Sequence, residues 1–489
     1  MGKAVGNLAI DGSNTGYDTV VFAENCEFST DCNLTGLNNN VLVKGASGSG
    51  KTFSYVEANI LRAFYRNLML VIRKPKMILK YAPMLRKRGY HVDVLNFCDP
   101  SQSTGAFDML HYVRSYQDVL YLARSIVMAN PQKKGDTKAD PYWDEAAIAL
   151  IAALILYTLL NKQVCCFADV IDLYKSMKVD YSSSIITTSL DGEFAKLERL
   201  APGNQACANW KVFRELPPRT AACVMGTLGA TLGHLFDPKL MEMMRMSNKM
   251  DFRKFSRRKS VLFIVVSAAN PAMDFVIGNF YATALKELYE TAQEQEDGKL
   301  PIPVHIMTDD ACSGACIANL PEMISIIREA QISISVVCQS NSQLSAVYGE
   351  SNAITIANCC DTHVYTGSMD LSSAREISTR LDIPVSDVLS LPLGSFAVFR
   401  RGSKPVIARR YQILEDKAYQ EVTCDFEKKE RRRKKGDSHS ISTYAQRRST
   451  EISYIAPKQT DTTQKKEVDS LEAEIYRRFD ELFGALDDD

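Results

Sequence analysis

The chain has 489 residues, of which 46% are hydrophobic and 24% are charged, with 58 basic and 58 acidic side chains. This length exceeds what one hydrophobic core usually organises, so we expect about two or three domains. Because the basic and acidic side chains are equal in number, the net charge of the chain identifies no class of binding partner. The thirteen cysteines are odd in number, follow no secretory signal and show no four-ligand zinc spacing, which argues for a cytoplasmic protein and against a disulfide-bonded secreted one.

The first part of the chain predicts alternating strands and helices. Residues 1–40 contain strand-like pieces such as 19–22 and end in a turn-prone run, so we expect one or two opening strands there. The segment 41–106 then predicts the first part of an α/β domain with a mainly parallel sheet. Its expected elements are a strand at 41–43, a helix at 53–66, and strands at 68–72 and 92–95.

Residues 107–255 change to helical periodicity and predict an inserted all-α domain. The most apolar stretch, 146–160, is shorter than the roughly 18 residues needed to cross a bilayer. Asp140 is a suitable N-cap for this helix, and Pro141 suits its first position. We therefore expect a buried helix here and no membrane anchor.

Strand-like runs separated by helical stretches return in residues 256–420, which predicts the second part of the α/β domain. The expected strands are 261–267, 304–308, 332–338 and 362–366, followed by a hairpin of 395–400 and 405–410. Residues 421–489 predict a flexible basic tail, disordered from Glu427 onward. The tail ends in an amphipathic helix begun near Asp469 or Ser470, whose apolar face indicates a protein partner or packing on the chain's own domain.

A glycine-rich loop after the strand at 41–43 fits the phosphate-binding (Walker A) pattern of P-loop NTPases. Glycines let main-chain N–H groups converge on phosphates, the following helix adds partial positive charge, and a lysine reaches the β- and γ-phosphates. The sequence therefore predicts ATP bound with Mg²⁺, Lys51 on the phosphates and Thr52 on the metal. A plain turn is the alternative, which the strand and helix around the loop disfavour. The loop consists of Gly45, Ala46, Ser47, Gly48, Ser49, Gly50, Lys51 and Thr52.

Two acids follow the apolar strand at 304–308. Phosphoryl transfer needs a carboxylate near the magnesium ion, usually at the end of a neighbouring strand. We expect Asp309 to hold Mg²⁺ and Asp310 to orient or activate the attacking water. Taken alone, such a pair is as often a turn or a helix cap; the phosphate loop upstream favours the catalytic interpretation.

Several segments together resemble the type IV secretion coupling proteins, the hexameric ATPases of conjugative DNA transfer. The resemblance covers roughly residues 35–415. It is carried by the loop 45–52, by 89–97, by Asp140-Pro141-Tyr142-Trp143, by Asp309-Asp310, by Arg328, by Gln339-Ser340 with 343–344 and 348–349, and by 358–361.

This resemblance implies a RecA-like motor domain with an inserted all-α domain, assembled as a homo-hexamer with nucleotide sites between subunits. It also implies single-stranded DNA with its relaxase, or protein substrates, and other secretion-system subunits as partners. By the motif match, Arg328 reaches the neighbouring subunit's nucleotide and Gln339 senses the γ-phosphate. Without the resemblance, Arg328 would be interpreted as a solvated or ion-paired side chain.

The chain departs from the family pattern in three places. Asp310 stands where family members commonly carry Glu, and since misplacement by about 1 Å can cost about a hundredfold in rate, weak ATP turnover is a hypothesis here. Lys74-Pro75-Lys76-Met77 replaces the usual Asp-Pro-Lys-Gly. The family's N-terminal membrane segments are missing, so we expect a trimmed chain or one peripheral at the cytoplasmic membrane through a partner. A nucleotide-binding assembly platform with little turnover is therefore the alternative function.

Basic clusters offer candidate contacts for nucleic acid. Exposed Lys and Arg usually only solvate a surface, and nothing in their spacing reads bases. The run 428–435 is equally suited to nucleic acid, an anionic membrane or a solubilising tail. The two clusters expected to face DNA are Lys74, Lys76, Lys80, Arg86, Lys87 and Arg88, or residues 253–259.

Overall fold

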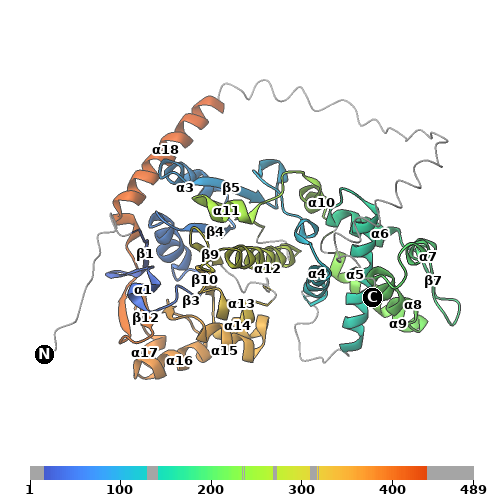
Figure 1. The fold of residues 1–489 in the computed structure, drawn as a ribbon. Coiled ribbons are helices and arrows are strands. Elements are labelled where there is room, and N and C mark those ends of the chain that lie inside the picture. The colour runs from blue at the N-terminus through green and yellow to red at the C-terminus, as the bar shows by residue number, and fades with distance from the viewer. Residues whose placement is uncertain are drawn as a thin grey trace.

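The computed structural model describes residues 16–128, 141–233, 235, 237–267, 272–308, 317 and 319–437. A nine-stranded sheet forms the centre of one half of the molecule (Figure 1). The strands from β11 to β5 are parallel, and β12 and β13 form an antiparallel hairpin at one edge, so the predicted mainly parallel sheet is confirmed. The order is β13 (Val406–Arg409), β12 (Ser395–Arg400), β11 (Thr362–Tyr365), β3 (Val41–Lys44), β10 (Ile332–Cys338), β9 (Val304–Thr308), β4 (Asn67–Ile72), β8 (Ser260–Val265) and β5 (His91–Asn96).

Both faces of this sheet are covered, because its parallel strands are apolar on both sides. Alternate residues of β3 enter different cores: Leu42 faces one, and Val41 and Val43 face the other. The first core includes helices α12 (Ala272–Gln293), α13 (Leu320–Ile326), α14 (Asn341–Tyr348) and α15 (Glu350–Asn358). The second includes η1 (Lys51–Glu57), α2 (Ala58–Leu61), α3 (Lys76–Lys87) and the N-terminal hairpin of β1 (Thr19–Ala23) and β2 (Cys26–Ser29).

Helices between β5 and β8 form the other half of the molecule (Figure 1). Among the described residues of this part, the one strand ladder pairs β6 (Val179–Asp180) with β7 (Thr187–Thr188), and helices predominate. Phe194 and Trp210 stack there with ring centroids 4.1 Å apart. The helices are α4 (Tyr116–Met128), α5 (Pro141–Asn161), α6 (Phe167–Ser176), α7 (Asp191–Leu200), α8 (Gln205–Arg214), α9 (Pro218–Gly233) and α10 (Pro238–Arg245). The last helix before β8, α11 (Phe252–Arg257), lies beside the sheet, next to β5 (Figure 1).

The long apolar helix α5 lies inside this helical half. Within the described residues it is the one helix long and apolar enough to cross a membrane, over Tyr142–Asn161, so the sequence estimate of its length was too short. Because 72% of its most apolar window is buried in the protein, its expected role as a core helix is confirmed.

The end of the helix after the phosphate-binding loop differs from the sequence prediction. The helix after the loop ends at Leu61 rather than at residue 66, because the carboxylate of Asp18 accepts hydrogen bonds from the main-chain N–H groups of Phe64, Tyr65 and Arg66 and holds that segment outside the helix.

The expected disorder from Glu427 onward is wrong as far as Asp437, because α18 (Lys417–Asp437) continues through this region and packs against α3. Tyr419 and Val422 are buried on one face of α18, and the Tyr419 ring meets Phe53 edge-on at 5.7 Å. The predicted terminal helix near 469–489 and the N-cap Asp140 lie outside the described residues.

Candidate nucleotide site

The phosphate-binding loop leaves the carboxyl end of β3, between β10 and β11. Main-chain hydrogen bonds tie its first residues to both neighbours: the N–H of Gly45 donates to the carbonyl of Cys338 at 3.2 Å, and that of Ala46 donates to Gly367 at 2.7 Å. Gly48 and Gly50 adopt φ angles of 78° and 99°, which side-chain-bearing residues rarely tolerate. Two glycines of the loop therefore adopt a backbone conformation that favours glycine.

Thr366, at the end of β11, packs directly against the loop. A Cβ atom on Gly45 would lie 1.8 Å from its hydroxyl, so a larger residue at position 45 would force the Thr366 side chain to move. The Thr366 hydroxyl also lies 2.6 Å from the Ser49 hydroxyl, and the Thr366 N–H donates to the Lys44 carbonyl at 2.8 Å. These contacts join residues more than 300 positions apart in the sequence. The sequence indicated only that a strand ends near residue 366.

Lys51 is buried within the curve of the loop and is 6% exposed. Its ammonium donates to the carbonyl of Ala46 at 2.8 Å and to that of Gly45. The helical segment η1 begins at Lys51 and places Thr52 in its first turn. Main-chain N–H groups at a helix start and a buried ammonium form a setting suited to bound phosphates.

An ion pair between the buried Lys44 and the partly exposed Glu376 fixes the end of β3, directly before the loop. Lys44 is 1% exposed, and its ammonium contacts Glu376 at 2.5 Å and Asn341 at 3.0 Å. Burial acts to raise the pKa of the Glu376 carboxyl, but the Lys44 ammonium and the Asn341 amide outweigh burial and hold the pKa below its usual value. Glu376 stays ionised, and the last residue of β3 is fixed in place.

Of the other residues predicted to lie at the carboxyl ends of the strands, one is described in the structure and two are not. Gln339 directly follows β10, beside the loop, and its N–H donates to the Gln343 side chain at 2.7 Å. Asp309 and Asp310 follow β9 in the sequence and lie outside the described residues. Within the described ranges, no group of three or more His, Cys, Asp or Glu side chains is placed to hold a metal ion.

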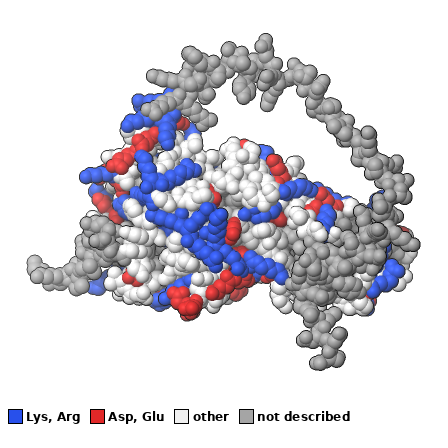
Figure 2. Space-filling model, turned by 45° about the horizontal axis from the view of Figure 1, so that its top comes forward, with Lys and Arg blue, Asp and Glu red and all other residues white. Residues whose placement is uncertain are grey.

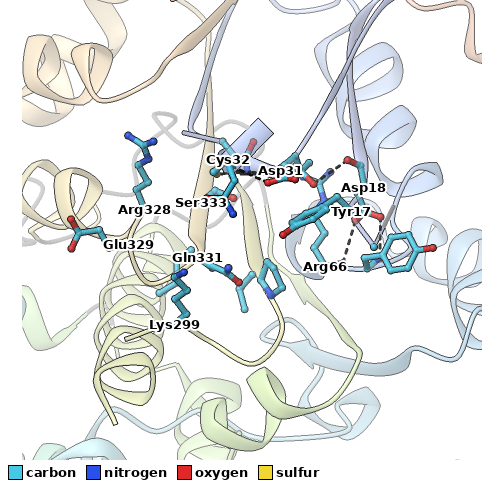
Figure 3. Close-up of a pocket in the computed structure, with 18 residues that line it drawn as sticks. Tyr17, Asp18, Asp31, Cys32, Arg66, Lys299, Arg328, Glu329, Gln331 and Ser333 are labelled. Carbon is cyan, nitrogen blue, oxygen red and sulfur yellow. Dashed lines mark hydrogen bonds and ion pairs between the residues drawn. The ribbon is translucent and has the colours of Figure 1, made fainter. Parts of the chain in front are cut away.

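Arg328 lies at the amino ends of the strands, opposite to the loop, four residues before β10 begins. It is exposed and lines a cavity of about 350 Å³, whose wall also includes Asp18, Arg66, Lys299 and Ser333. Figure 3 shows Arg328 and Glu329 on one side of this cavity and Tyr17 and Asp18 on the other. Because β3 and β10 run parallel, Arg328 is separated from the loop of its own chain by the length of the sheet.

A row of hydrogen-bonded buried polar groups runs along the sheet from the amino ends of its strands toward the loop. The His305 ring nitrogens lie 2.7 Å from the Ser333 hydroxyl and 2.8 Å from the Ser335 hydroxyl, and Ser335 meets the Tyr55 hydroxyl at 2.6 Å. Burial, and then the charge of Arg66, lower the pKa of His305 well below its usual value, so the ring is neutral. These residues link the cavity wall to the helix after the loop, and no sequence motif indicated them.

Solved structures with a similar fold include three of the plasmid coupling protein TrwB. The complex with the GTP analogue GDPNP has a TM-score of 0.52 at 16% identity and covers 76% of this chain and 85% of that chain. The complex with the ATP analogue ADPNP has a TM-score of 0.50 at 17% identity, and the complex with ADP and Mg²⁺ has 0.51 at 18%, each covering 76% of this chain and 84% of the other. At these identities the similarity shows the fold alone, which confirms the predicted RecA-like architecture.

Among curated proteins, none matches this sequence significantly. The model of the family described as type IV secretory system conjugative DNA transfer matches residues 9–381, more than half of the chain. The loop, the parallel sheet that carries it and this match agree with the resemblance found in the sequence motifs. The chain belongs to the type IV secretory system conjugative DNA transfer family.

Proposed function

We propose that this protein is an ATP-driven coupling protein that brings relaxase-bound single-stranded DNA, or protein substrates, to a secretion channel. The loop from Gly45 to Thr52, held between β10 and β11 with Lys51 buried inside it, is the observation that carries the proposal. Nucleotide complexes of TrwB, including one with ADP and Mg²⁺, support ATP and Mg²⁺ as the cofactors.

Each remaining site residue has a proposed role in hydrolysis. Thr52 and Asp309 hold Mg²⁺, Asp310 orients the attacking water, and Gln339 responds to the γ-phosphate. The position of Gln339 directly after β10, next to the strand that carries the loop, supports its role.

A ring of identical subunits fits the separation of Arg328 from the loop. An interface that joins the amino ends of one subunit's strands to the carboxyl ends of the next subunit's strands is head-to-tail. Such an interface forms a ring when the rotation between subunits closes, and an open filament when it does not. Arg328 of one subunit would then approach the nucleotide of its neighbour. We propose a homo-hexamer on this basis and on the family resemblance.

The DNA-facing surface involves only part of the predicted basic clusters. Lys and Arg gather in a band across one face, from α18 toward the middle of the molecule (Figure 2). Many of the candidates are engaged within the protein. Their partners are Glu430 for Lys76, Glu57 for Lys80, Asp425 for Lys87, the Leu61 carbonyl for Arg88, Glu294 for Arg253, Asp93 for Arg258 and the Arg88 carbonyl for Lys259. The exposed candidates are Lys74, Lys76, Arg86 and Lys87 near α3, and Lys254 and Arg257 on α11. Of these, Lys76 and Lys87 also form ion pairs with α18 at the surface.

Steady-state phosphate release, with and without single-stranded DNA, tests the motor function. We expect turnover that rises with DNA in the wild-type protein and falls to background in Lys51→Ala, because the variant loses the cation that contacts the phosphates. Absence of turnover in an assembled wild-type ring would exclude the motor.

A nucleotide-binding assembly platform with little turnover is the second candidate, favoured by Asp310 and by the exposed Lys74 in place of the family's usual acid. Asp310→Glu separates the two, because a longer side chain should shorten the gap to water and raise turnover several-fold if side-chain length limits the rate. Unchanged turnover in this variant would contradict that explanation. Binding of secretion-system subunits and membrane contact through a partner belong to either function.

A further inference from the structure

Arg410, directly after β13, lies beside the phosphate-binding loop of its own chain. A Cβ atom on Gly50 would lie 3.7 Å from Nη1 and 3.8 Å from Cδ of Arg410. On the other side, a Cβ atom on Gly394 would lie 3.5 Å from both Cδ and Nε. The Arg410 side chain thus runs between two glycines that both have positive φ angles, and its guanidinium ends next to the residue that precedes Lys51.

The backbone around Arg410 is held in place on both sides. Its N–H donates to the Gly394 carbonyl at 2.7 Å, and the Arg409 carbonyl before it accepts from the N–H of Glu24 at 2.8 Å. The Tyr411 hydroxyl after it donates to Asp416 at 2.6 Å and accepts from Arg62 at 2.6 Å. Arg62 directly follows α2, which continues the helical segment after the phosphate-binding loop. The Arg62–Tyr411 contact therefore links the segment next to Arg410 to that helix.

The guanidinium itself has no protein partner in the part of the chain that the structure describes, where no ion pair or hydrogen bond involves it. Neighbouring arginines differ: Arg401 pairs with Asp361 at 2.9 Å, and Arg400 lies over the Phe28 ring at 4.1 Å. Arg410 is exposed, so its charge is available to a ligand bound at the loop. A fixed backbone beneath an unpaired cation is the arrangement that a binding residue needs.

We propose that Arg410 binds the polyphosphate of the nucleotide held by its own chain, as a second cation beside Lys51. The proposal rests on the proposed nucleotide site and adds a residue from the hairpin β12–β13. A planar guanidinium suits phosphate because it donates two parallel hydrogen bonds, which an ammonium cannot do. Arg410 therefore acts within one chain, whereas Arg328 lies at the opposite edge of the sheet.

The test compares three variants of the full chain by calorimetric binding of ATP and of inorganic tripolyphosphate. Arg410→Gln is expected to weaken both affinities about tenfold, the scale of one charge-assisted hydrogen bond. Arg410→Lys should fall between wild type and Arg410→Gln. Arg409→Gln is the matched control, because it removes an exposed arginine from the adjacent position of the same strand, and it should bind as wild type does.

The outcomes separate this proposal from the function on which it rests. Wild-type affinity in Arg410→Gln, together with lost binding in Lys51→Ala, would overturn the role of Arg410 and leave the nucleotide site standing. A loss for ATP without a loss for tripolyphosphate would also overturn it, because the contact would then be to the nucleoside. Failure of the wild-type chain to bind ATP would overturn both.

Discussion

Lys44 and Lys51, at the carboxyl ends of the central strands, are held differently from Arg328, at their amino ends. At the carboxyl edge, Lys44 and Lys51 are buried, and hydrogen bonds within the chain fix both ammonium groups. At the amino edge, Arg328 is exposed, and its contact with the Gly36 carbonyl is long, at 3.4 Å. The lysines of the loop are thus held by their own chain, while the Arg328 guanidinium is exposed and lies away from that loop. This difference predicts that removing residues from the two edges will have separable effects.

The largest expected effect belongs to Arg328→Ala. Loss of an arginine that stabilises transferring phosphate from a neighbouring subunit costs about a thousandfold or more in turnover. Because Arg328 lies far from the loop of its own chain, we expect the ATP affinity of the isolated chain to stay at the wild-type value. Arg401→Ala is the control, since Arg401 also contacts the Gly36 carbonyl, at 3.3 Å. Because Arg401 pairs with the buried Asp361 at 2.9 Å, this variant should lose some stability and keep wild-type turnover. Phosphate release and ATP titrations measure the two quantities.

Mixing two inactive variants sharpens the comparison of the edges. Arg328→Ala supplies an intact Lys51, and Lys51→Ala supplies an intact Arg328, so mixed rings contain interfaces with both residues present. We expect turnover to reappear on mixing and to peak near equal proportions. A mixture as inactive as its components would show that the two residues do not act across an interface.

A smaller effect is expected from Glu376→Gln, which removes the carboxylate that faces the buried Lys44 ammonium. Removing one partner of a buried pair leaves an uncompensated charge; with Glu376 partly exposed, we expect about 2 kcal/mol of lost stability. Urea unfolding measures this loss, and ATP affinity should fall with it because Lys44 anchors the loop.

The double variant Lys44→Met with Glu376→Gln checks the cause. It lacks the stranded charge and should regain part of the stability that Glu376→Gln loses. A double variant whose loss equals the sum of the two single losses would contradict the coupling.

The parts of the site that could be predicted from the sequence are those encoded locally. The strand expected at 41–43, the glycine-rich loop and the helix expected from residue 53 follow one another in the chain, so their order follows from neighbouring residues alone. The structure extends the strand to Lys44 and begins the helix at Lys51. The parallel strands were also predictable, because each is a short apolar run between helical stretches.

The supports of the site could not be predicted, because they join distant residues. Lys44 and Glu376 are 332 positions apart, and nothing near Lys44 marks it as a buried lysine. Thr366 and His305 have no motif and depend on the strand order. The helix α18 was missed for another reason: its charged composition hides the narrow apolar face that includes Tyr419 and Val422.

The smallest expected effect is a pH dependence of stability from His363, which lies near the Lys44 pair. Burial, then the charges of Arg380 and Lys44, lower its pKa from 6.5 to about 4. Its Nε2–H donates to the Ala357 carbonyl, and its Nδ1 accepts from Arg380, so the folded protein holds a neutral ring. The unfolded chain takes up a proton as pH falls below 6.5 and the folded chain does not; stability is therefore fully present above pH 6.5 and declines toward pH 4.

His363→Gln tests this, because glutamine keeps one donor and one acceptor but does not titrate. Urea unfolding at intervals between pH 7 and pH 4 should give a shallower decline for His363→Gln than for wild type, with the difference approaching roughly 3 kcal/mol near pH 4. The decline that remains would come from groups such as His305, whose pKa is also lowered. Glu376 adds to the decline below about pH 5, because its pKa is lowered in the folded protein and the unfolded chain therefore takes up the proton first. Equal declines in the two proteins would mean that His363 is protonated in the folded state.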